Sequence, residues 1–288
     1  MNNNKKPATE NMSITYDIVE ETTDKTVKQL RWNMATGLQK IDNLEPSLYL
    51  KELIKENVTG TITSYEVEDA LHEYYKTIDL SKSENQKQNE ADLTSTRIKQ
   101  LLDDESFSFR PVELQYIHGY LFNGIYDNAG KVRTYNITKK EPILNNATVS
   151  YISFNRIEDT LKYDFEEEKG IDYISLNPTK RIKQIAKFTS AIWQVHAFGD
   201  GNTRTIAVFI AKYLTTKGFN VDLSLFEKTS PYFRNALVRS NYENLSKNIK
   251  STNKFLEKYF DNLLNGAKHK LNNKDLYVSG RDKSKNNE

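Results

Sequence analysis

Apolar residues recur through most of this chain at spacings of three and four positions, which marks one face of an α-helix. The pattern begins near residue 25, and Trp32, Leu38 and Ile41 supply its first apolar face. Thr63-Ser-Tyr-Glu66 has the composition of a capping box, in which the Thr63 hydroxyl accepts from a first-turn N–H and Glu66 reaches back. Residues 25–80 are therefore predicted to form a small helical accessory segment.

A polar stretch, Ser81–Asn89, separates this segment from a second helical region. Its composition is typical of a linker, so we place a soft domain boundary there. The predicted starts of later helices are Pro111, Asn177-Pro178, Asn202 and Ser230-Pro231, and a last helix carries Phe255 to Leu263. Residues 91–265 are thus predicted to form a mainly α core.

One part of this core has a different pattern. Residues 131–137 and 147–152 are short runs that flank Pro142 and the pair Asn145-Asn146. Turn-forming residues between two such runs predict a β-hairpin in an otherwise helical chain.

Composition narrows the function classes. The chain has 288 residues, with 41 Lys and Arg against 39 Asp and Glu, and the two signs are interspersed, so the sequence predicts no nucleic-acid partner. Without cysteine, thiol catalysis and cysteine-bound metals are excluded. The polar ends, residues 1–24 and 279–288, are predicted to be disordered. No apolar run suits a signal peptide or a membrane span, which predicts a cytoplasmic protein without a membrane partner.

The strongest chemical signal is the segment His196-Ala-Phe-Gly-Asp-Gly-Asn-Thr-Arg204 between two predicted helices. The first-turn N–H groups of the second helix form an anion site that suits phosphate, and Arg204 adds a guanidinium. Asp200 offers a hard oxygen for Mg²⁺, and His196 can take a proton from a hydroxyl. Together these groups favour phosphoryl or nucleotidyl transfer.

Simpler explanations exist for each residue alone. A single histidine at a helix end is usually structural, and Asp-Gly-Asn is common in turns. The alternating acidic ligands and closing Glu of a calcium-binding EF-hand are missing. It is the conjunction at fixed spacing between two helices that argues for a site.

The segment resembles the signature of the Fic family, which has His, then Phe, an acidic residue, Gly-Asn, a small residue and Arg. The resemblance covers about residues 91–265, and includes Gly130–Ile137, which is similar to the start of the family's hairpin flap. It implies a Fic helical core with a small β-hairpin flap, preceded by the accessory segment. The Doc branch, which phosphorylates, has Ala at position 201 and Lys at position 203, whereas this chain has Gly and Thr.

The resemblance also implies roles for individual residues. His196 would be the general base, and Asp200 would hold Mg²⁺ (or Mn²⁺). Ser230–Tyr242 resembles the family's later nucleotide-side helix. The nucleotide-binding residues implied in this way are Gly201, Asn202, Thr203, Arg204, Asn235 and Tyr242.

This chain departs from the family in two respects. A second Arg that grips the γ-phosphate in many members is Ala207 here, so the γ-phosphate is expected to be held loosely or by a residue from elsewhere, such as Lys139 or Lys140 of the hairpin. The inhibitory Ser/Thr-x-x-x-Glu-Gly or Glu-Asn motif has no clean copy, because Ser64-x-x-x-Glu68 is followed by Asp69. We therefore expect little gain in activity when residues 1–80 are deleted.

The main hypothesis is a protein adenylyltransferase that moves AMP from Mg-ATP to a Ser, Thr or Tyr hydroxyl of a target protein or of itself. A second is a Fic-fold enzyme with another cargo: UMP, GMP, phosphocholine, or removal of AMP. A third is a non-catalytic interaction protein on a Fic scaffold. The accessory segment packs either on its own core or on a second copy in a homo-oligomer.

Overall fold

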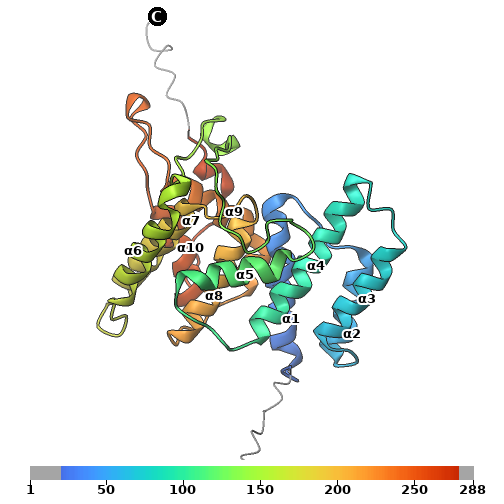
Figure 1. Cartoon of the computed structure of the whole chain (residues 1–288). Helices are drawn as coiled ribbons and strands as arrows, with labels where there is room; N and C mark the ends of the chain where they lie inside the picture. The colour runs from blue at the N-terminus through green and yellow to red at the C-terminus, as the bar shows by residue number, and fades with distance from the viewer. Residues whose placement is uncertain (1–20, 279–288) are drawn as a thin grey trace, which may run out of the picture.

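The computed structural model describes residues 21–278 and is mainly helical (Figure 1). The predicted disordered ends fall largely outside this range, but Glu21–Asp24 is ordered because Asp24 caps the first helix. Within the described range the principal helices are α1 (Lys25–Gln39), α2 (Leu48–Thr59), α3 (Ser64–Lys76), α4 (Ser83–Asp103), α5 (Pro111–Phe122), α6 (Ile157–Lys169), α7 (Pro178–Val195), α8 (Asn202–Thr216), α9 (Ser224–Ser240) and α10 (Lys254–Asn265). None of them is both long and apolar enough to cross a membrane.

Helix α8 lies at the centre of the fold, and its residues from Asn202 to Leu214 are all buried. It packs against α5, α7 and α4. Apolar side chains around the whole helix explain this position, since a helix that is hydrophobic on every side is stable only when covered. The start of the central helix is therefore held by neighbours on several sides.

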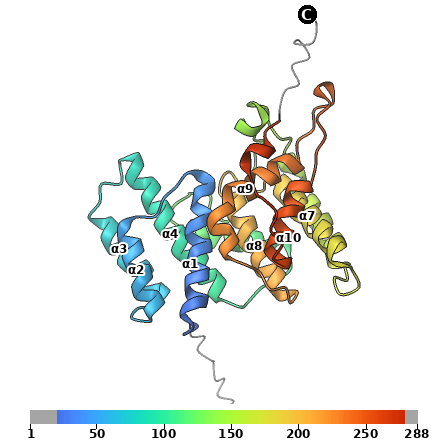
Figure 2. The same cartoon turned by 180° about the vertical axis from the view of Figure 1, so that it is seen from behind.

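The accessory segment is part of the same core. Helix α1 packs against both α4 and α9, as Figures 1 and 2 show from opposite sides. Trp32, Met34 and Leu38 belong to one hydrophobic cluster with α8 and α9. At Gly37 a β-carbon would lie 2.3 Å from the Cα of Glu227 in α9, so the two helices meet at van der Waals distance. Of the two arrangements expected for this segment, the structure shows packing on its own core.

Local signals in the sequence are confirmed at several helix starts. Thr63 and Glu66 form the expected capping box, and Asn177 accepts from the N–H of Lys180 at 2.9 Å. Pro111 and Pro178 occupy first-turn positions, where a missing N–H costs nothing. These features depend only on residues close in sequence.

The polar stretch 81–89 is not a linker, because Ser83 already begins α4. Its side chains are largely exposed, whereas α4 is buried from Ala91 onward between other helices. The predicted start of α9 is also wrong, since Pro231 lies inside the helix. Pro231 leaves the Glu227 carbonyl without its usual donor, and the Nζ of Lys40 donates to that carbonyl at 3.0 Å.

The predicted β-hairpin is not observed in residues 131–152. A single antiparallel bridge joins Lys140 and Thr148 around a 3₁₀ turn, Pro142–Leu144. Backbone N–H groups of both arms bond at the end of α7 instead of forming a strand ladder: that of Arg133 donates to the Ala197 carbonyl and that of Ile152 to the Gln194 carbonyl. The exposed carbonyls of a helix end compete for the same N–H groups that a hairpin needs.

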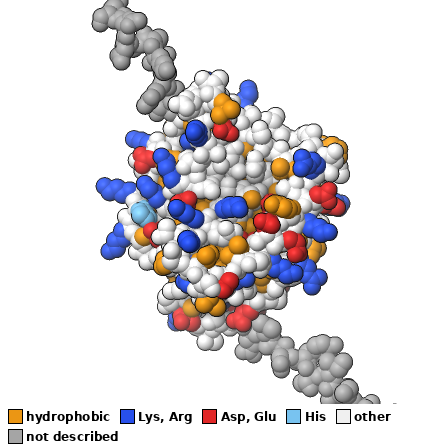
Figure 3. Space-filling view, turned by 90° about the vertical axis from the view of Figure 1, so that its left-hand side faces the viewer, with side chains coloured by type: hydrophobic (Ala, Val, Ile, Leu, Met, Phe, Trp, Pro, Cys, Tyr) orange, Lys and Arg blue, Asp and Glu red, His pale blue; other side chains and the backbone are white. Residues whose placement is uncertain are grey.

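The face shown in Figure 3 carries basic, acidic and hydrophobic side chains, and the basic ones gather toward its left-hand side.

Candidate active site

The turn that contains the candidate catalytic residues, His196 to Gly201, connects the end of α7 to the start of α8. His196 has a left-handed backbone, with φ of 49°, and Gly201 has φ of 71°. The Asn202 side chain clamps the turn, since its Oδ1 accepts from Phe198 N–H at 3.0 Å and its Nδ2 donates to the Phe198 carbonyl at 2.8 Å. Asn202 therefore shapes the loop that carries the expected phosphate site.

Gly201 is needed for two physical reasons. Its positive φ is a conformation that L side chains rarely adopt. A β-carbon there would also lie 2.4 Å from the ring of Phe122 in α5. Only glycine allows this turn to sit against α5.

His196 is held as a neutral base. Its Nδ1 lies 3.3 Å from the Trp193 carbonyl, which can only accept, so Nδ1 carries the proton and Nε2 has a free lone pair. The ring stacks on Tyr151 with centroids 4.0 Å apart. Burial is the main cause that lowers the pKa of His196 to about 3, and nearby basic side chains add to it. The imidazole is therefore unprotonated at neutral pH.

The first turn of α8 offers free donors next to this base. The backbone N–H groups of Asn202, Thr203 and Arg204 donate to no residue in the range 21–278. The Thr203 hydroxyl accepts from Trp193 Nε1 at 2.9 Å and keeps its own proton available. Exposed Asp200 accepts from Gly201 N–H at 2.7 Å through one oxygen, which leaves the other free. Unpaired N–H groups at a helix start favour an anion.

Arg204 is buried among residues from elsewhere in the chain. It is 1% exposed, and its Nε lies 2.9 Å from Asp42 and its Nη2 2.7 Å from Glu90. It also donates to Gln39 at 3.1 Å and to the Tyr126 hydroxyl at 3.1 Å. Protein groups thus surround the expected phosphate-gripping guanidinium, although its Nε makes no hydrogen bond despite lying close to Asp42.

Asp42 comes from the accessory segment, at the end of the 3₁₀ turn Lys40–Asp42 that follows α1. The sequence pointed to Glu68 as the nearest match to an inhibitory carboxylate, and no local pattern marks Asp42. The accessory segment therefore contributes a carboxylate to the site.

The space around His196 is small. A cavity of about 20 Å³ remains, roughly the room of one water molecule. Its lining comprises Asp42, Lys139, Trp193, His196, Asp200, Gly201, Asn202, Thr203 and Arg234. The structure thus brings the expected residues 196 and 200–203 together with Lys139, but leaves no room for a nucleotide in this conformation.

Two expected nucleotide-binding residues lie away from this cavity. The Asn235 amide donates to the Asn273 side chain at 2.9 Å. Tyr242 is 4% exposed and receives a contact from Asn244 at 3.4 Å. Their neighbour Arg234 lines the cavity instead, and it forms an ion pair with Glu141 at 2.7 Å.

His118 of α5, which the sequence did not single out, holds the turn by a hydrogen bond and by ring stacking. Its Nδ1 accepts from Gly130 N–H at 2.8 Å, so its Nε2 carries the proton and donates to the Asp200 carbonyl at 3.1 Å. The ring stacks on Phe198 with centroids 3.9 Å apart. In the sequence, His118 is marked only by its position in α5, 12 residues before Gly130.

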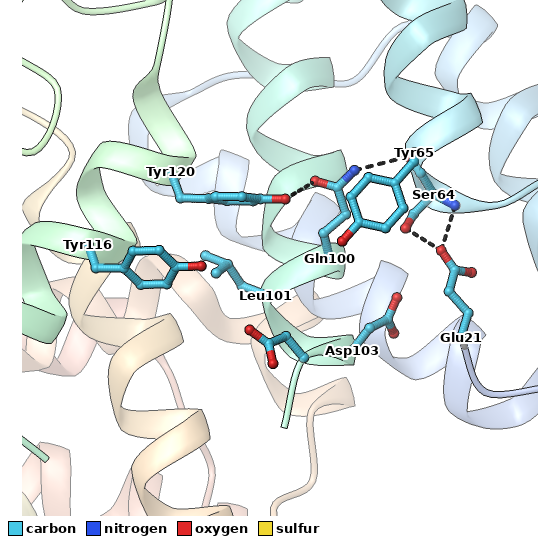
Figure 4. A pocket seen from close by; sticks show the side chains of 9 residues that line it. Glu21, Ser64, Tyr65, Gln100, Leu101, Asp103, Tyr116 and Tyr120 are labelled. Atoms are coloured by element: carbon cyan, nitrogen blue, oxygen red, sulfur yellow. Dashed lines mark hydrogen bonds between the residues drawn. The ribbon is translucent and has the colours of Figure 1, made fainter. Parts of the chain in front are cut away.

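A larger cavity, of about 160 Å³, lies between α3, α4 and α5 (Figure 4). Its carboxylates are already paired, because buried Lys99 lies 2.7 Å from Glu21 and 2.5 Å from Asp103. Tyr120 donates to Gln100 at 2.9 Å on its wall. We interpret this cavity as a junction between the accessory segment and the core.

Acidification is expected to destabilise the protein through His196. Because its pKa falls from about 6.5 when unfolded to about 3 when folded, the unfolded state binds more protons between these values. Stability therefore falls as pH decreases, and between pH 7 and pH 5 His196 contributes about 2 kcal/mol of this loss. Urea unfolding at pH 7 and pH 5 measures this loss of stability in the wild type and in His196→Ala. An equal loss in both proteins would contradict the lowered pKa of His196.

Two comparisons with known proteins find the same family. Residues 108–214 match the sequence model of the Fic/DOC family. No curated protein matches the chain.

Two similar solved structures are Fic domains of Bartonella effectors. The N-terminal Fic domain of a VirB-translocated effector from Bartonella sp. 1-1C has a TM-score of 0.53 and 19% identity, over 66% of this chain and 88% of that one. The corresponding domain from Bartonella sp. AR 15-3 has a TM-score of 0.53 and 16% identity, over 66% and 86%. The matched segment, residues 108–214, contains the whole turn from His196 to Arg204, so this part of the chain is similar to the Fic/DOC family in sequence.

Proposed function

We propose that this chain transfers AMP from Mg-ATP to a hydroxyl group on a protein side chain. The observation that carries the proposal is a neutral histidine, with its Nε2 lone pair free, beside unpaired N–H groups at the start of α8. In this reaction the hydroxyl oxygen forms a bond to the α-phosphorus, and the bond from that phosphorus to the α,β-bridging oxygen breaks. Pyrophosphate leaves, and the hydroxyl proton passes to Nε2 of His196.

The phosphates would bind at the start of α8. The free N–H groups of residues 202–204 and the positive end of the helix dipole suit the α- and β-phosphates. Lys139 in the cavity lining is a cation for the γ-phosphate, as expected from the absence of a second arginine at Ala207. Arg204 joins these contacts only by exchanging Asp42 for a phosphate oxygen.

A divalent cation fits the donor set at Asp200. One free carboxylate oxygen together with substrate phosphates is a common way to hold Mg²⁺. No cluster of three or more His, Asp or Glu side chains suited to a metal exists among residues 21–278, so the phosphates would supply the other ligands. The cation would neutralise charge on the phosphates.

The test is incubation with labelled ATP, GTP, CTP and UTP, each with and without cell lysate. Labelling of the protein or a lysate protein by ATP alone, with a mass gain of one AMP, supports the proposal. Labelling by UTP or GTP identifies another cargo for the same fold. Absence of both labelling and Mg-ATP binding would favour a non-catalytic interaction protein.

Replacing Asp200 with alanine is expected to weaken binding of the metal ion that transfer requires. Because the carboxylate is the protein's own ligand, the Mg²⁺ concentration for half-maximal rate should rise by at least roughly 10-fold, the low end for loss of even an outer partner. A magnesium titration of wild type and Asp200→Ala measures this. Exposed Asp172→Ala is the control, and full activity of wild type in EDTA would contradict the metal assignment.

Replacing Asp42 with asparagine is expected to increase nucleotide affinity. The substitution keeps the side chain's shape but removes a negative charge from the lining of the cavity that would receive the phosphates. At charge separations of a few ångströms this repulsion corresponds to roughly 10- to 100-fold in Kd. Calorimetry with Mg-ATP measures the change, with Asp79→Asn, a surface aspartate, as control. Unchanged affinity would show that Asp42 does not oppose binding, as the sequence analysis expected of the accessory segment.

A further inference from the structure

Arg133 is a buried cation in the segment between α5 and the 3₁₀ turn at Pro142. It is 3% exposed, and its nearest polar partners are backbone carbonyl groups. Its Nε donates to His196 at 2.7 Å, and its Nη2 donates to Val195 at 3.2 Å and to Ile152 at 2.5 Å. Its Nη1 donates to the backbone carbonyl of Tyr135. No carboxylate in the range 21–278 pairs with this guanidinium.

The end of α7 compensates for the buried charge. A helix end presents unpaired carbonyls and the negative end of the dipole, and the last turn of α7 contains no basic residue of its own. Arg133 provides this cation from 62 positions earlier in the chain. Its own backbone N–H donates to the next carbonyl, that of Ala197, at 2.9 Å. One residue thus bonds three consecutive carbonyls, from 195 to 197.

These bonds determine the backbone on both sides of the base. The peptide planes before and after the Cα of His196 carry the carbonyls of Val195 and His196, and one guanidinium holds both. His196 has a left-handed φ of 49°, which a non-glycine residue keeps only when its surroundings impose it. The same conformation brings Nδ1 to the Trp193 carbonyl and leaves Nε2 unprotonated.

We propose that Arg133 is the positioning residue for His196: its planar fork holds the two peptide planes that flank the base and so presents Nε2 to the hydroxyl that loses its proton. The inference rests on the proposed function for that last step, but the positioning of the imidazole is a property of the chain itself. Lysine keeps the charge of arginine but lacks the fork, so it does not hold two planes at once.

The competing explanation is that Arg133 only caps α7 and stabilises the fold. Arg181 offers a matched control, because it also donates to two successive carbonyls, those of Tyr173 and Ile174, at 2.6 and 3.0 Å. Its contacts lie at the other end of α7. Loss of Arg181 therefore removes two guanidinium–carbonyl bonds, to the loop before α7, without touching the base.

The experiment compares wild type, Arg133→Lys, Arg133→Gln and Arg181→Gln as full chains. Single-turnover transfer and Mg-ATP affinity are measured for each, together with ¹⁵N spectra of the histidine imidazoles, in which His196→Ala assigns the signal. In both Arg133 variants we expect the transfer rate to fall roughly 10- to 100-fold, the effect of a small misplacement of a reacting group. Their Kd for Mg-ATP should stay within about threefold of the wild-type value, because Arg133 does not hold the start of α8.

The spectra give a readout that does not depend on transfer. Wild type should show a single neutral His196 with the proton on Nδ1, and Arg133→Lys should show a mixture of the two tautomers. Arg181→Gln should lose stability but keep both the wild-type rate and the wild-type His196 signal.

A wild-type rate and tautomer in folded Arg133→Lys would overturn the proposal, as would a parallel loss of rate and affinity that Arg181→Gln reproduces. If wild type transfers no nucleotide, the proposed function fails and the tautomer alone decides the positioning role. If neither Arg133 variant folds, a proton on Nε2 of wild-type His196 contradicts the inference.

Discussion

Replacing His196 with alanine is expected to abolish transfer while the protein still binds Mg-ATP. The imidazole in the cavity is neutral at neutral pH and its Nε2 lone pair is free, and removal of a general base costs on the order of 10²- to 10⁴-fold in rate. The phosphate contacts come from the start of α8, which His196 does not cap, so affinity should change little.

Single-turnover kinetics and calorimetry on the same preparation measure the two effects separately. His72→Ala is the matched control, since His72 is half exposed on α3 and far along the chain from the turn. A His196→Ala protein that transfers AMP at the wild-type rate would remove the base from the mechanism. Equal loss of affinity and rate would mean that the substitution damages the pocket.

Replacing Arg204 with alanine is expected to destabilise the folded protein by about 3–5 kcal/mol, the usual cost of breaking a buried ion pair. The substitution leaves Asp42 and Glu90 close together without their shared cation, with side chains only 25% and 18% exposed. The pKa of Asp42 is already raised by burial, and the Arg204 guanidinium opposes that rise. Without Arg204, Asp42 should take up a proton more readily.

Urea unfolding measures this loss, and a double mutant tests its cause. If repulsion and desolvation of the two carboxylates explain the loss, Arg204→Ala with Asp42→Asn should be more stable than the sum of the single effects. Strict additivity would argue that the packing of Arg204, and not its charge, dominates. Nucleotide affinity of the double mutant then shows whether Arg204 also binds phosphate.

Position 207 shows how burial changes an argument made from sequence. Ala207 is correctly identified as unable to hold a phosphate, but it is also fully buried within α8. An arginine introduced there would need room inside a close-packed core. The folding stability of an Ala207→Arg protein should therefore be measured before its nucleotide affinity.

Much of the fold is determined locally, and the sequence alone predicts it. The capping box at Thr63, the Asn177 cap and the glycine-containing turn before Asn202 each involve residues within a few positions of one another. Helical periodicity works for the same reason, since one turn relates neighbours three and four apart. The Fic signature is also local, so its His196 and Asp200 are found without a structure.

The partners of the charged residues were decided only by the tertiary structure. Arg204 meets Gln39 and Glu90 across 165 and 114 positions, and Arg133 meets His196 across 63. The same long-range packing brings both arms of the predicted hairpin to the end of α7, which takes the N–H groups that strand pairing requires. A buried charged group or N–H group forms its hydrogen bond with a partner that the packed helices bring close. The spacing of residues in the sequence does not indicate which partner that is.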